Sequence, residues 1–159
     1  MKTFDIHKYD GLLLPPGFTK MASTEAGRKL IMECCNGVGS KVGWFNRLFY
    51  HFIPNTVYFL NVTACSDLHD FGSTYPNHFV NRIEAIKHLK ANNLQLRENL
   101  ETYIDTHTKN EWLLNARLKR AINYYSAVRI AGDKSFFNNK TFDDDSPLRD
   151  LQLKGMLFK

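Results

Sequence analysis

The sequence predicts a single all-α domain, from the helical spacing of its apolar residues, its length and its composition. The chain has 159 residues, of which 43% are hydrophobic and 23% charged, and these fractions are close to those of ordinary globular proteins. A chain of this length can bury a hydrophobic core of its own. We therefore expect one domain over residues 1–159, with an arm over residues 1–22 and a tail over residues 133–159.

The N-terminal arm is expected to be extended, to pack across the domain and to end in a turn. Two glycines and two prolines fall within residues 11–17, and this composition disfavours a helix. A first helix should then run from about Thr24 to Cys35, because Ser23 and Thr24 offer an N-cap and apolar residues follow on one helical face.

A strongly aromatic patch over residues 44–54 follows a glycine-rich loop. It could form a short helix or an irregular wall, which Pro54 closes. Packing in the core is the favoured interpretation of this patch. A rim that contacts lipid is the alternative.

Helical spacing dominates the rest of the chain. A short helix should begin near Asn61 or Thr63 and end by Gly72, and a turn over residues 73–77 should follow it. The amphipathic segment from Phe79 to Ile104 is expected to form one bent helix or two.

The clearest helix should cover Glu111–Ala131, where apolar residues form a continuous stripe. Gly132 stands at the position that commonly follows a helix end. The tail from Asp133 onward is expected to be a loop, with a short helix over residues 147–153.

The net charge of +5 and the pI near 9.1 favour anionic partners. A phospholipid or anionic membrane surface is one such partner, and nucleic acid is another. The basic residues of the last long helix are more typical of a solvated face than of a nucleic-acid contact; they are Arg117, Lys119, Arg120 and Arg129. Nucleic acid is therefore the less favoured partner.

The chain lacks a run of about eighteen apolar residues and an apolar signal-peptide core near Met1. We therefore expect no transmembrane segment and a cytoplasmic or phage-associated protein. The three cysteines are an odd number, so at least one thiol is free. The disulfide state of Cys34, Cys35 and Cys65 stays open.

Two motifs carry the most specific chemistry. Residues 35–43 form a glycine-rich loop whose backbone can bend enough to turn several carbonyls inward. About thirty residues later, His69 and Asp70 are adjacent on the short predicted helix, and neighbours on a helix point about 100° apart. One of the two can therefore face a substrate while the other faces a metal. Carbonyls together with a carboxylate are ligands that suit calcium.

This combination resembles the phospholipase A2 superfamily, in which a glycine-rich calcium loop precedes a helix with a His-Asp pair. The resemblance is closest to small prokaryotic members, where the phrase Ala-Cys-x-x-His-Asp-Phe-Gly recurs. Residues 64–72 carry that phrase with one extra residue between Cys65 and His69. Residues 124–132 also fit the phrase Tyr-Tyr-x-Ala-Val-Arg-x-x-Gly of similar small bacterial and phage-borne proteins.

The resemblance implies a phospholipase A2-like helical core and calcium-dependent hydrolysis of phospholipid esters. It makes His69 the general base that takes a proton from water. It also makes Asp70 a calcium ligand, together with the main-chain carbonyls of Cys35, Gly37 and Gly39.

One departure from the family concerns the second carboxylate, which holds the histidine in its working tautomer. Ile86 stands where this acid is expected, and an isoleucine cannot orient an imidazole. We therefore expect weak turnover or none. The alternatives are a catalytically degenerate relative that serves as an interaction protein for a protein or membrane partner, and a basic nucleic-acid-associated phage protein.

The residues themselves leave two other chemistries open. Cys65 and His69 are four residues apart, so that with Cys34 or Cys35 they could bind zinc, although a full ligand set at standard spacing is missing. Cys65 could also act as a nucleophile activated by His69. That role needs a lowered thiol pKa, which apolar surroundings do not favour.

Overall fold

The computed structural model describes residues 3–35, 56–138 and 140–144. The described residues are mainly α-helical, and their strands form two small sheets of two strands each. The all-α expectation is confirmed in its coarser form, a mainly α-helical fold, and the two small sheets were not predicted. The glycine-rich loop with Gly37 and Gly39, the aromatic patch over residues 44–54 and the helix expected over residues 147–153 lie outside the described residues.

The N-terminal arm is more helical than the sequence predicted. It contains a 3-10 helix η1 (His7–Tyr9) and a short helix α1 (Phe18–Ala22). Gly17 begins α1 with a φ of 83°, a left-handed conformation that glycine adopts readily, and this allows the turn and the helix to follow each other directly. The expectation of an extended arm without a helix was therefore wrong for these residues.

Helix α2 (Glu25–Cys34) matches the helix predicted from about Thr24 to Cys35. The Thr24 hydroxyl caps it by accepting a hydrogen bond from the Gly27 amide at 3.0 Å. The arm packs against α4 through a chain of aromatic contacts, and Ile31 of α2 belongs to the same buried cluster. The aromatic residues of the chain of contacts, in order, are Tyr9, Phe18, Phe71 and Tyr75.

Polar contacts fix the arm as well. The Lys8 ammonium pairs with the buried Asp67 carboxylate of α4. Leu13 and Asn99 form a reciprocal pair, in which the Leu13 amide donates to Asn99 Oδ1 at 2.7 Å and Asn99 Nδ2 donates to the Leu13 carbonyl at 2.9 Å. The arm crosses the domain as expected, and it is anchored to two different helices.

A short hairpin leads into the helix that carries the His-Asp pair. Strands β1 (Thr56–Val57) and β2 (Leu60–Asn61) pair antiparallel. The two residues between them have left-handed φ values of 44° and 67°. Helix α4 (Thr63–Thr74) follows, and it ends two residues beyond Gly72, where the sequence predicted its end. The Tyr75–Pro76 peptide bond after it is cis.

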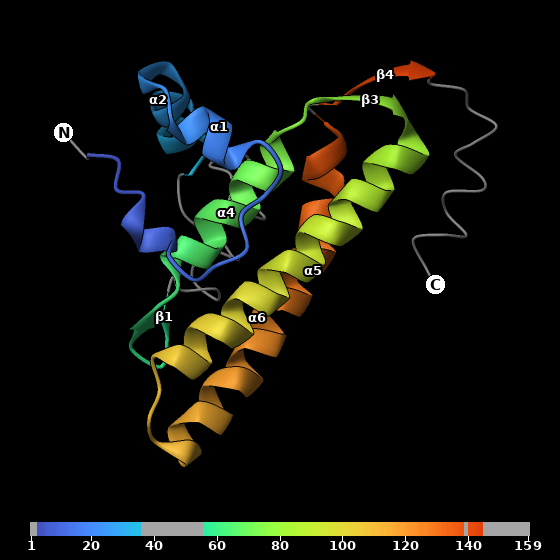
Figure 1. The fold of residues 1–159 in the computed structure, drawn as a ribbon. Helices are drawn as coiled ribbons and strands as arrows, with labels where there is room; N and C mark the ends of the chain where they lie inside the picture. Colours follow the sequence, from blue (N-terminus) through green and yellow to red (C-terminus); the bar gives the residue numbers. More distant parts are fainter. Residues whose placement is uncertain (1–2, 36–55, 139, 145–159) are drawn as a thin grey trace.

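Two long helices form the main body of the molecule and lie side by side in Figure 1. They are α5 (Arg82–Thr106) and α6 (Glu111–Phe137). Each begins at an asparagine whose side chain caps the first turn. The segment predicted as one helix or two is thus one helix, preceded by strand β3 (His78–Asn81), which contains Phe79.

Helix α6 does not end at Gly132 as predicted. A glycine inside a helix costs only about 1 kcal/mol relative to alanine, and the extra turns bring Phe136 into a buried cluster with Phe79 and Leu89. Strand β4 (Thr141–Asp144) then pairs parallel with β3. Residues 133–137 are therefore helix rather than loop.

Helix α4 lies between the N-terminal helices on one side and α5 on the other (Figure 1). The largest cluster of buried residues fills the space between α4, α5 and α6. Among the described residues, the helices are too short or too polar to cross a bilayer. The position of α4 places the His-Asp pair at the junction of the arm and the long helices.

We predict that Lys8→Met destabilises the fold by about 1–3 kcal/mol, because it removes the ion pair between the Lys8 ammonium and the buried carboxylate of Asp67. The measurement is the free energy of unfolding in urea. The matched control is Lys87→Met, which removes an exposed pair with Glu84 and should change stability by less than about 0.5 kcal/mol. An equal effect of the two substitutions would contradict the anchoring role of Lys8.

Candidate functional site

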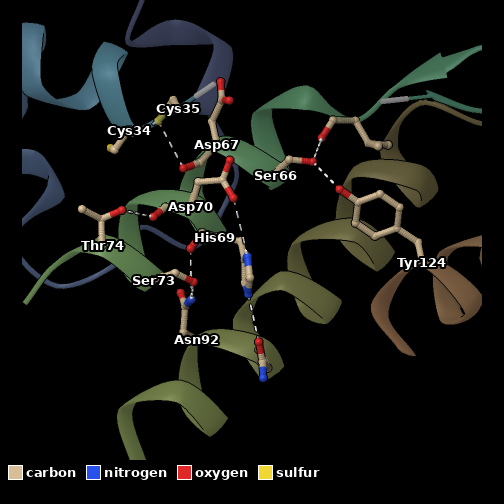
Figure 2. A network of polar contacts seen from close by, with 12 residues as sticks. Cys34, Cys35, Ser66, Asp67, His69, Asp70, Ser73, Thr74, Asn92 and Tyr124 are labelled. Atoms are coloured by element: carbon tan, nitrogen blue, oxygen red, sulfur yellow. Dashed lines mark hydrogen bonds and ion pairs between the residues drawn. The ribbon is translucent and has the colours of Figure 1, made fainter. Parts of the chain in front are cut away.

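Four successive residues of α4 face three different surroundings, and together they form the candidate site. His69 points to α5, Asp70 lies at the partly exposed edge, Phe71 enters the core with the arm, and Gly72 meets α5 again. Figure 2 shows His69 and Asp70 with the polar contacts around them. Residues 69–72, which the sequence singled out for function, thus also determine how α4 packs against α5 and the arm.

The imidazole of His69 is held by an amide. His69 Nε2 lies 2.9 Å from Asn93 Oδ1 of α5, and its side chain is only 10% exposed. Because an amide oxygen only accepts, Nε2 carries the proton and Nδ1 keeps a lone pair. Burial lowers the pKa of His69, and the hydrogen bond with Asn93 only partly opposes this effect. His69 is therefore neutral near pH 7, as a general base must be.

The partner of His69 is not at the position where the family phrase placed it. Ile86 is buried on α5, whereas Asn93 lies seven residues, about two helical turns, further along the same face. The residue of α5 that contacts the imidazole is thus an asparagine, Asn93, and not residue 86. The signal in the sequence was the pair Asn92-Asn93 between the apolar residues Leu89 and Leu96, a polar interruption of a buried stripe.

Asn92 supports the site through the backbone of α4. Its Nδ2 donates to the His69 carbonyl at 3.0 Å and to Ser73 Oγ at 2.9 Å. A Cβ at Gly72 would come within 2.0 Å of Asn92 Oδ1. The two helices can approach closely enough for these contacts only because residue 72 is glycine.

Asp70 lies beside the histidine with a carboxylate that water only partly solvates. Its side chain is 27% exposed, and its Oδ1 is 4.0 Å from His69 Nδ1. Burial, followed by the negative charges of Asp67 and Cys34, raises the pKa of Asp70 well above its usual value. A bound cation would offset this effect, so the carboxylate fits the role of a metal ligand.

The other expected calcium ligands are only partly described. Cys35 directly follows α2, and its thiol donates to the Asp67 carbonyl at 3.2 Å, so Cys35 lies against α4. Gly37 and Gly39 lie outside the described residues. In the described ranges, no group of three or more His, Cys, Asp or Glu side chains is arranged to hold a metal ion. Among the described residues, the zinc set of Cys65 and His69 with Cys34 or Cys35 is therefore not formed.

Cys65 is unsuited to act as a nucleophile. It is fully buried in the core cluster, and burial raises its pKa to about 12. All three cysteines are free thiols in the structure. The neighbouring Ser66 contacts Tyr124 Oη at 2.7 Å, which ties α4 to α6 in the interior.

The described fold and site define a mainly α-helical protein with a neutral histidine held between two helices and a carboxylate at its side. Comparison with known proteins adds no relative: no family model, no curated protein and no solved structure matches this chain. Function must therefore be argued from the site itself.

We predict that Asp70→Asn stabilises the metal-free protein at pH 7. A carboxyl whose pKa is higher in the folded chain loses stability as the pH rises from its unfolded pKa to its folded pKa. At pH 7 the folded wild type therefore carries a free-energy cost for ionising the Asp70 carboxyl. The Asp70→Asn variant does not, because its side-chain amide does not ionise. We expect a gain of about 0.5–2 kcal/mol in urea unfolding with chelator present, and a smaller gain near pH 4.

The matched control is Glu98→Gln, at an exposed position of α5, which should leave stability nearly unchanged. A loss of stability in Asp70→Asn at pH 7 would show that the carboxylate already has a stabilising partner.

Proposed function

We propose that this protein is a phospholipase A2-like hydrolase that cleaves phospholipid esters in a calcium-dependent reaction, with His69 as the general base. The observation that carries the proposal is the hydrogen bond from His69 Nε2 to Asn93, which fixes a neutral imidazole with its Nδ1 lone pair beside Asp70. The resemblance of residues 64–72 to the family's helix supplies the reaction class.

The proposed reaction uses the imidazole twice. Nδ1 of His69 takes a proton from water while the water oxygen bonds to the ester carbonyl carbon. The ester C–O bond then breaks, and the imidazolium returns the proton to the leaving oxygen. A fatty acid and a lysophospholipid result. Calcium bound by Asp70 and the carbonyls of Cys35, Gly37 and Gly39 would polarise the ester carbonyl.

Asn93 acts as a positioning residue in this scheme. Its Oδ1 accepts a hydrogen bond from the Nε2–H group of His69 and so keeps the working tautomer. Unlike a carboxylate, it carries no charge to stabilise the imidazolium that forms. The loss of an orienting acid lowers the rate by about four orders of magnitude in a serine protease, so we expect slow turnover.

A phospholipid substrate also fits the surface near the hairpin. Phe59 is 99% exposed and Trp112 is 78% exposed. Arg117 of α6 donates to the Tyr58 carbonyl at 3.0 Å, which joins the hairpin to the start of α6. Exposed aromatic side chains on a basic protein are suited to an anionic membrane surface.

The amide at residue 93 also favours a second candidate function, an interaction protein without catalysis. In that case the same helices would bind a membrane or protein partner, and His69 would be a satisfied structural histidine. The two candidates share the surface and differ in turnover.

We predict that wild-type protein releases fatty acid from vesicles of fluorescent phosphatidylglycerol in calcium but not in chelator. His69→Ala should lower the rate at least about 100-fold, because general-base catalysis contributes about 100- to 10,000-fold. Asn93→Asp should raise the rate, since a carboxylate stabilises the imidazolium. It should also move the acidic limb of the pH profile to higher pH, because the nearby charge raises the pKa of His69.

The rate and the pH profile of Asn93→Asp together distinguish a positioning role of Asn93 from a merely structural one. A structural change alone would not move the pH profile. If neither the wild type nor Asn93→Asp exceeds His69→Ala, the hydrolase proposal fails for this substrate. Sedimentation with the same vesicles then tests the second candidate.

A further inference from the structure

The turn of the β1–β2 hairpin holds two aromatic residues in a backbone conformation that disfavours them. Tyr58 and Phe59 connect the paired strands with φ values of 44° and 67°. Two-residue hairpin loops with positive φ at both positions strongly favour asparagine and glycine, because a Cβ crowds the backbone in this region. A tyrosine followed by a phenylalanine therefore strains the turn.

Packing within the described chain does not offset this strain. Phe59 is 99% exposed and Tyr58 is 52% exposed, so Phe59 gains almost no stabilisation from burial when the chain folds. A bulky residue at a strained backbone position indicates a functional contact. An exposed apolar side chain there indicates that the contact is made with something outside the chain.

The strained turn is nevertheless held firmly. The buried side chain of Arg117 donates from Nη2 to the Tyr58 carbonyl at 3.0 Å and from Nη1 to Thr108 Oγ1 at 2.8 Å. Thr108 lies in the connection between α5 and α6. The guanidinium thus ties the turn to the end of the helix pair that lies away from β3 and β4 in Figure 1, and Phe59 projects from a fixed base.

A second exposed aromatic side chain lies at this end of the helix pair. Trp112, in the first turn of α6, is 78% exposed. The formal charges of residues 105–117 cancel, because Asp105 and Glu111 balance Lys109 and Arg117. Aromatic side chains collect where the headgroups of a bilayer meet its acyl chains. An aromatic end without net charge therefore suits a bilayer surface better than a polyanion.

We propose that the Tyr58–Phe59 turn, together with Trp112, anchors the protein to a phospholipid bilayer by this end of the α5–α6 pair. The inference rests on the membrane surface of the proposed function and deepens it, because it names the inserting residues. His69 binds Asn93, thirteen residues before the end of α5 at Thr106 and about 20 Å away along the helix. Substitutions in the anchor therefore leave the candidate site untouched.

The test measures vesicle binding in the His69→Ala background with chelator present, so that neither turnover nor calcium affects the result. The readout is sedimentation with vesicles of phosphatidylcholine, with and without phosphatidylglycerol. Phe59→Gly should weaken binding about tenfold on both vesicles, because the burial of one phenylalanine is lost. It should also raise the urea midpoint of unfolding, since glycine adopts a positive φ readily. A residue that serves only the fold would not change binding and stability in opposite directions.

The matched control is Ile130→Ala, because Ile130 is 77% exposed on the same helix but eighteen residues beyond Trp112. It should leave binding unchanged, whereas Trp112→Ala should weaken it. Insertion is observed directly with Phe59→Trp in a chain that also carries Trp44→Phe and Trp112→Phe. Its fluorescence should shift to shorter wavelength when vesicles are added.

Four results would overturn the anchor. They are a parent protein that binds neither vesicle, Phe59→Gly that binds as tightly as its parent, Ile130→Ala that weakens binding equally, and Phe59→Trp fluorescence that vesicles do not shift. Hydrolysis is measured separately with His69 intact. Turnover by a protein that meets any of these four results leaves the hydrolase standing without the anchor. Anchored protein without turnover leaves the anchor standing without the hydrolase.

Discussion

The close contact between α4 and α5 at Gly72 is the constraint on which the candidate site depends. No side chain larger than hydrogen fits there, because a Cβ would come within 2.0 Å of the Asn92 amide oxygen. That proximity lets Asn92 reach the His69 carbonyl and Asn93 reach the His69 ring. The position of α5 thus fixes both the backbone and the imidazole of the same residue.

The end of α4 is held from further directions. His88 Nε2 donates to the Gly72 carbonyl at 2.7 Å. The Lys140 ammonium donates to the carbonyls of Ser73, Thr74 and Pro76 and lies 4.6 Å from the centre of the Phe136 ring. A helix end needs partners for its last carbonyl groups, and here residues distant in sequence supply them. The contacts of Lys140 thus join the chain after α6 to the end of α4.

Much of the helical fold followed from local pattern. The helices α2, α4 and α6 were predicted near their true starts, because caps and apolar periodicity act within a few residues. The short strand pair β3 and β4 was not predicted, because residues 78 and 141 meet only through tertiary packing. The extension of α6 was missed for a similar reason, since burial of Phe136 outweighs the local preference of Gly132 for a helix end.

The site was partly predictable for the same physical reasons. His69 and Asp70 were identified from their adjacency, and the structure places their side chains next to each other. Asn93 was missed because its contact with His69 depends on where two helices cross rather than on spacing within one helix. A family phrase aligned by sequence pointed to Ile86, whereas packing selects the residue two turns later.

The Asn93 amide has a consequence for how such a protein changes over evolution. Asparagine and aspartate have nearly the same shape, and their codons differ at a single nucleotide. A substitution in either direction would keep the 2.9 Å contact with His69 and the packing around it, while it adds or removes one negative charge beside the imidazole. One mutational step would therefore add or remove the charge that can stabilise an imidazolium at His69, with no change in the scaffold.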